Sequence, residues 1–182
     1  MGAWRAAGGH SLAELLVATA IVGLVMAGVY TILHTGLKTY GWGAARVDAQ
    51  QSARIALERM VKELREAGYD PRLAGIAPIL VAEPARVTFQ RDLDGDGVMA
   101  ATRERVTFVL RPGETVLRRD AGAGAQPIIE GVRRLVLTYF DGAGRATADA
   151  GAIASIRIYL ETGLGGPVIV MQTQVSLRNR PG

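Results

Sequence analysis

The sequence has no cysteine and only two histidines, and both shortages exclude whole classes of functional site. Without cysteine, the chain has no disulfide, no thiolate zinc site and no cysteine nucleophile. The histidines, His10 and His34, lie beside or inside an apolar run, so the remainder of the chain has no histidine for catalysis or metal binding. The sequence also has no phosphate-binding loop or zinc motif, and we therefore do not expect an enzyme.

Aromatic residues and clustered charge are also scarce. Aromatics are 5% of the chain and the net charge is only +4. The basic residues are scattered, and Arg118-Arg119 and Arg133-Arg134 are only doublets. Because nucleic-acid binders usually gather Lys and Arg on one face, nucleic acid is not an expected partner. A length of 182 residues allows one globular domain with an accessory segment.

The feature that dominates the sequence is a long uncharged run near the N-terminus. Residues 15–33 read LLVATAIVGLVMAGVYTIL. As a helix, these 19 residues span about 28 Å, enough to cross a hydrocarbon core of about 30 Å. An ordinary secretory signal has a shorter apolar core that is followed by small residues at the cleavage site. Here the small residues Gly8 and Gly9 precede the run, so cleavage beside them would leave the anchor on the mature protein.

The residues that lead into this run form a recognisable motif, GHSLAELLVA over residues 9–18. It resembles the class III signal of type IV prepilins and pseudopilins, in which Gly9 would precede the scissile bond and Glu14 would be the glutamate five residues later. The resemblance implies cleavage by prepilin peptidase between Gly9 and His10, methylation of the new amine, and filament assembly through Glu14. His10 departs from the family pattern, which usually has phenylalanine there.

The pattern after the run predicts that the helix continues. Gly36, Gly41 and Gly43 weaken it and could mark a bend or a segment that melts on assembly. Beyond them, a three-four spacing of apolar residues predicts an amphipathic helix that ends at about Ala67, with Gly68 as its C-cap. Glu58 has two partners at helical spacing, Arg54 and Lys62. The buried face is predicted to hold Ala53, Ala56, Leu57, Met60, Val61, Leu64 and Ala67.

The helical segment 51–69 resembles the corresponding segment of PilW-type minor pilins and related minor pseudopilins. The match is carried by Arg54, Ala56, Leu57, Leu64, Arg65, Ala67, Gly68 and Tyr69.

The rest of the chain alternates like short antiparallel strands separated by turn residues. One long helix followed by such a sheet predicts an α+β fold of the pilin type. We expect four parts: a leader (1–9), a transmembrane and filament-core helix (10–37), an amphipathic helix (38–68) and a β-rich head (69–182). Strands are predicted at 86–91, 105–110, 115–118, 134–140, 155–161 and 168–177, with exposed loops at 120–126 and 141–151.

An acidic loop is the one candidate ligand site of the head. Asp92, Asp94 and Asp96 alternate with Gly95 and Gly97. Such carboxylates can converge on a calcium ion, with Glu104 as a possible fourth ligand, although no EF-hand helices flank the loop. In the alternative interpretation, Asp and Gly serve turn chemistry, and Arg91 and Arg103 neutralise the charge.

The resemblance implies a structural subunit: a minor pilin that primes assembly of a type IV pilus or displays its head there. Two alternatives stay open, a minor pseudopilin of a type II secretion system and a membrane-anchored calcium-binding adhesion module. The implied partners are prepilin peptidase, other pilin or pseudopilin subunits and the membrane. The implied location is the inner membrane with the head in the periplasm, and then the filament at the cell surface.

Overall fold

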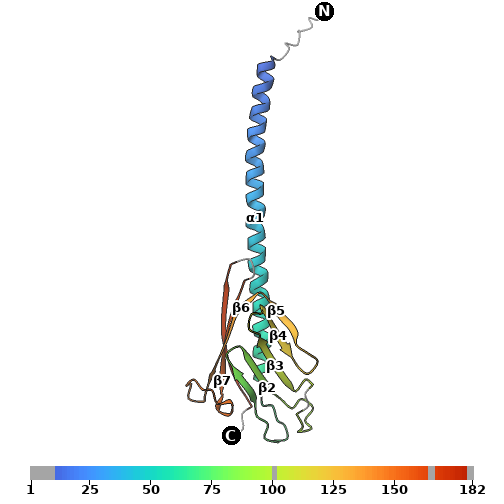
Figure 1. Ribbon diagram of the computed structural model, residues 1–182, viewed down its shortest axis with the longest axis vertical. Coiled ribbons are helices and arrows are strands. Elements are labelled where there is room, and N and C mark those ends of the chain that lie inside the picture. The colour runs from blue at the N-terminus through green and yellow to red at the C-terminus, as the bar shows by residue number, and fades with distance from the viewer. Residues whose placement is uncertain (1–10, 100–101, 164–166, 180–182) are drawn as a thin grey trace, which may run out of the picture. The chain divides into compact units, whose positions relative to one another are not determined.

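The computed structural model describes residues 11–99, 102–163 and 167–179, which form one long helix and eight strands (Figure 1). Helix α1 (Leu12–Arg65) is followed by β1 (Ile79–Glu83), β2 (Arg86–Gln90), β3 (Arg105–Leu110), β4 (Val116–Asp120), β5 (Gln126–Glu130) and β6 (Val132–Phe140). A short 3-10 helix, η1 (Ala150–Ala152), precedes β7 (Ser155–Thr162) and β8 (Ile169–Ser176). The predicted leader lies outside the described residues.

The strands form two antiparallel sheets. The first has the order β1-β2-β3-β4-β5 and the second has the order β6-β7-β8. The fold is therefore α+β with a pilin-like architecture, as predicted, although the head contains two sheets and not one. The six predicted strands are present with shifts of a few residues at their ends, whereas β1 and β5 were not predicted.

The chain forms two compact units, residues 1–44 and 45–182. Helix α1 contributes to both of them and passes through Gly36, Gly41 and Gly43 without interruption. Because an isolated chain does not report on assembly, melting of this segment in a filament stays a prediction.

In the second unit, the C-terminal turns of α1 pack into the core of the head. The predicted helix face is confirmed, because its residues are buried except for Val61, which is half-buried. Against this face lie Phe89 and Phe108, whose rings stack at 6.1 Å, and the alternating residues Ile156, Ile158 and Leu160 of β7. Burial of this many apolar side chains is the main stabilising term of the head.

Helix α1 ends at Arg65, two residues before the predicted end. Glu66 and Ala67 donate to the carbonyls of Glu63 and Leu64, three residues earlier, so the last turn tightens. Gly68 follows with a φ of +74°, and its N–H donates to the carbonyl of Gln90 at 2.8 Å. Glycine adopts this left-handed conformation without strain, so Gly68 terminates the helix as predicted.

A buried ion-pair network joins α1 to the first sheet. Glu63 is 9% exposed, and both of its carboxylate oxygens accept from Arg119 Nε of β4, at 2.9 and 2.8 Å. Arg59 Nε donates to the same carboxylate at 3.1 Å. Arg91, just after β2, pairs with Glu66. The network fixes the rotation of α1 against the sheet, because each buried charge requires its partner.

Candidate functional site

The apolar half of α1 exposes its side chains all around its circumference. Leu16, Leu24 and Ile32 are 62%, 76% and 75% exposed, and the helix is long and apolar enough to cross a membrane. In water such a surface is unfavourable by about 25 cal/mol for each Å² of apolar area. The segment therefore requires lipid or other apolar helices around it.

The polar side chains of this segment bond within the helix itself. The hydroxyls of Thr19 and Thr31 donate to the carbonyls of Leu15 and Ala27, four residues earlier, at 3.0 and 2.8 Å. A hydroxyl with an internal partner does not need water, so it is tolerated in a bilayer or between packed helices. The local hydrogen bonding is therefore suited to an apolar environment.

Glu14 lies in the first turn of α1 and is exposed. Within the described residues, this carboxylate has neither a hydrogen bond nor an ion pair. The helix dipole favours a negative charge at this end, but an ionised carboxylate next to an apolar run is costly if it remains unpaired. Its partner must therefore be water, a lipid headgroup or a group beyond the described residues. The predicted cleavage residues, Gly9 and His10, also lie outside the described residues.

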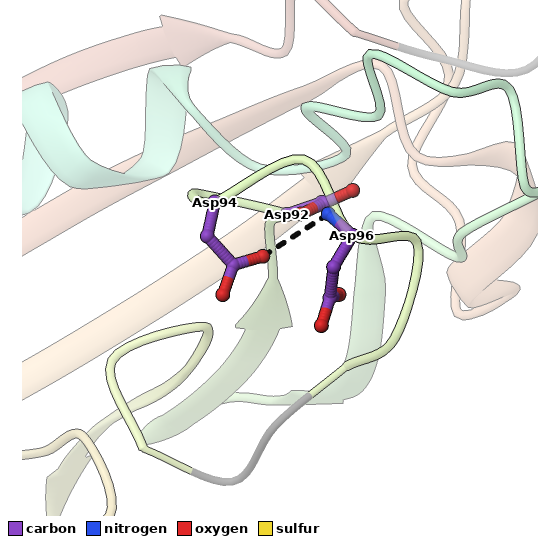
Figure 2. Close-up of side chains that lie close together, drawn as sticks. All are labelled: Asp92, Asp94 and Asp96. Carbon is purple, nitrogen blue, oxygen red and sulfur yellow. Dashed lines mark hydrogen bonds between the residues drawn. The ribbon is translucent and has the colours of Figure 1, made fainter.

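The acidic loop brings three carboxylates together, as Figure 2 shows. Ligand oxygens of Asp92, Asp94 and Asp96 all lie within 4.8 Å of one another. Asp92 is fully buried, whereas Asp94 and Asp96 are exposed. The sequence prediction that these three side chains converge is correct.

Each aspartate also shapes the loop through backbone hydrogen bonds. The two carboxylate oxygens of Asp92 accept from the N–H groups of Gly95 and Gly97, at 2.7 and 3.0 Å. Asp94 accepts from the N–H of Asp96 at 3.1 Å, and Asp96 from that of Val98 at 2.7 Å. These are the local turns that aspartate favours, so the turn chemistry of the alternative interpretation is present.

Glu104, the predicted fourth ligand, contacts the start of the loop. It is 3% exposed, and its carboxylate accepts from the N–H of Leu93 at 3.0 Å. Its part in a metal site stays a prediction. Sequence spacing did not predict this hydrogen bond, because it joins residues that are 11 apart in the chain.

The predicted neutralisation by arginine is not observed. Arg91 forms ion pairs with Glu66 and Glu63 of α1, and Arg103 makes no ion pair within the described residues. The charges of Asp94 and Asp96 therefore have no arginine partner in that part of the chain. Calcium binding by the loop stays a prediction, with a thermal-stability test given below.

Comparison with known families assigns the N-terminus. The family model described as the prokaryotic N-terminal methylation motif matches residues 4–30, which include Gly9, His10 and Glu14. No curated protein matches the chain. The match ends before residues 51–69, so the resemblance to PilW-type subunits stays a prediction. With this motif at its N-terminus, the chain is similar to type IV prepilins and pseudopilins in that segment, and its long apolar helix and α+β head give it a pilin-like architecture.

Proposed function

We propose that this pilin-type protein is a minor pilin, which prepilin peptidase cleaves after Gly9 and which then enters a type IV pilus. The observation that carries the proposal is the coincidence of the methylation motif at residues 4–30 with an exposed apolar helix directly after it. Cleavage at Gly9 removes only the leader and retains the apolar segment. The mature subunit therefore keeps both its membrane anchor and its assembly surface.

In this proposal Glu14 sets the axial position of a subunit in the filament. Cleavage creates a positively charged amine on His10, and Glu14 of an incoming subunit pairs with that amine on a neighbour. Each charge is costly alone in a low-dielectric surrounding, and the pair reduces the cost of both. The absence of any partner for Glu14 within the described residues agrees with a partner on another subunit.

The orientation in the membrane follows from the same motif. Arg5 and the amino terminus keep the leader in the cytoplasm, where prepilin peptidase acts, and the head crosses to the periplasm. After processing, assembly draws the apolar segment from the inner membrane into the filament core. The head then lies at the filament surface, and its role is to prime assembly or to be displayed there.

The decisive experiment is the intact mass of the full chain after co-expression with a prepilin peptidase, beside Gly9→Val as control. We expect the wild type alone to lose residues 1–9 and, with the methylase activity present, to gain one methyl group on His10. An uncleaved wild-type chain would make the protein a simple membrane-anchored protein and refute the proposal.

The role of Glu14 has its own test, which uses the cleaved protein. We expect Glu14→Ala to be processed normally but to be absent from sheared filaments, whereas Glu14→Asp restores part of the incorporation. Equal incorporation of Glu14→Ala and the wild type would refute the pairing.

Deletion of the gene should abolish or reduce piliation. If the deletion left pili intact but blocked secretion of an exported protein, the protein would be a minor pseudopilin and not a minor pilin.

A further inference from the structure

Strand β8 is an edge strand without the features that normally protect such an edge. Within the described residues, its only strand neighbour is β7, and the register between the two is unbroken over all eight residues. The strand reads IVMQTQVS and contains neither a charge nor a proline. Natural proteins usually protect exposed edges with charges, prolines or bulges, because an unprotected edge pairs with other chains.

The edge strand β5 of the other sheet provides the contrast. It is only five residues long, contains Pro127 and Glu130, and pairs with β4 across a register shift. Each of these features opposes the addition of another strand. Of these two edge strands, β8 is therefore the one that is suitable for pairing.

A groove separates β8 from α1, with a volume of about 950 Å³. Its apolar lining includes Leu57 and Val61 of the helix and Met171 of the strand. Leu160 of β7 is fully buried, but its cross-strand partner Met171 is only half-buried, although both face the same side of the sheet. The core-facing side of β8 is therefore incompletely covered by the chain itself.

The rim of this groove carries uncompensated positive charge. Lys62, Arg65 and Arg178 line it and are exposed, and within the described residues none of them makes an ion pair. The acidic groups of the rim are already engaged, because Glu58 pairs with Arg54 at 2.8 Å and Glu66 pairs with Arg91. Contrary to the sequence prediction, Glu58 does not pair with Lys62. The free charge at the groove therefore favours an acidic occupant.

We propose that the edge of β8 binds an extended acidic segment of a partner protein, which adds as a fourth strand beside β8 and fills the groove. Backbone hydrogen bonds to the free edge supply affinity, as in other cases of strand addition. On the face of the segment that meets α1, apolar side chains cover Met171 and Val61, and carboxylates two residues away from them meet Lys62 and Arg65. This docking surface is separate from the assembly surface of the apolar helix, so it does not depend on the filament proposal.

The test uses the full chain in detergent micelles and fluorescent peptide probes of defined composition. The acidic probe is (Glu-Thr-Val-Thr)2, which has Glu and Val on the same face of a strand, and its counterparts are (Lys-Thr-Val-Thr)2 and (Glu-Thr-Val-Thr)2 with N-methyl groups on alternate amides. The N-methylated probe keeps the charges and side chains but cannot pair along one edge. Binding is measured by fluorescence anisotropy, and the site is located by amide hydrogen exchange of residues 169–176.

We expect (Glu-Thr-Val-Thr)2 to bind, to slow exchange in β8, and to lose affinity on N-methylation. Because each exposed ion pair contributes up to about fivefold in affinity, Lys62→Glu with Arg65→Glu should weaken binding by more than roughly tenfold. The matched control is Arg86→Glu with Arg105→Glu, two exposed arginines of the first sheet whose reversal changes the net charge equally and should leave site-specific binding intact.

Several results would overturn the proposal. They are equal binding of the acidic and basic probes, binding that N-methylation leaves unchanged, and binding without protection of β8. An equal loss in the two double variants would show attraction by net charge alone. Absence of binding by the acidic probe would also refute the proposal, and it would leave the cleavage and assembly tests unaffected.

Discussion

Substitution of Gly68 by alanine tests how the helix end is locked into the head. Gly68 has a φ of +74°, and a Cβ there would lie 2.1 Å from the carbonyl oxygen of Asn179 and 2.8 Å from Cγ of Pro78. The left-handed conformation costs a residue with a Cβ about 1 kcal/mol. Crowding at a closely packed position adds about 2 kcal/mol. We therefore expect Gly68→Ala to lower the free energy of unfolding of the head by about 3 kcal/mol.

Gly113→Ala separates the two contributions. Gly113 has nearly the same φ, +77°, but an added Cβ there would meet nothing within 4 Å. This control should therefore lose only about 1 kcal/mol, the conformational part. The difference of about 2 kcal/mol corresponds to a roughly 30-fold faster exchange of core amides in Gly68→Ala than in Gly113→Ala. Hydrogen exchange of the full chain in micelles measures this ratio, and equal rates in the two variants would refute the steric argument.

Three further predictions concern charge in the head. Glu63→Gln should destabilise the head by about 3 kcal/mol in chemical denaturation, because it leaves Arg119 without its buried carboxylate. The exposed pair of Glu58 and Arg54 provides the control, and Glu58→Gln should cost less than about 0.5 kcal/mol. Similar losses of stability in the two variants would contradict the importance of the buried network. Burial raises the pKa of Tyr139, so the unfolded chain releases the phenol proton at about pH 10 while the folded head retains it. The stabilisation that this group contributes should be complete below that pH and decline above it. Tyr139→Phe should be less stable at pH 8, but its free energy of unfolding should change less between pH 9 and 11, and parallel curves for the variant and the wild type would contradict the assignment. Calcium at tenfold its dissociation constant should stabilise the head by about 1.4 kcal/mol relative to the protein in chelator. Magnesium should stabilise it less, and calcium should not stabilise Asp94→Asn. A melting temperature that calcium leaves unchanged would count against the site.

The helix and the motif were predictable because their signals are local. The uncharged run at residues 15–33 and the spacing of Gly9 and Glu14 each lie within a short stretch of sequence. The apolar spacing from Ala53 to Ala67 also identified the buried helix face, since helical periodicity places those residues on one side. Gly68 was recognisable as the helix stop because few other residues adopt its conformation.

The differences from the sequence predictions have three separate causes. Strand β5 begins at the last residue of the loop predicted at 120–126 and was not predicted, because Pro127 and the neighbouring glycines outweigh its short apolar pattern. Glu104 was predicted only as a metal ligand, and the hydrogen bond that its carboxylate accepts from the N–H of Leu93 joins residues 11 apart in the chain. Lys62 was paired with Glu58 on spacing alone, whereas Arg54 occupies that carboxylate.

The sequence by itself determined the N-terminal methylation motif, the long apolar helix, the α+β class and the convergence of the three aspartates. These depend on patterns among residues that are close together in the chain, where backbone geometry is nearly independent of distant contacts. The tertiary structure alone decided the division into two sheets, the burial of Glu63 beside Arg119, and the open edge of β8 beside a cationic groove. These depend on which surfaces remain uncovered after packing, and packing is set by contacts between residues far apart in the chain.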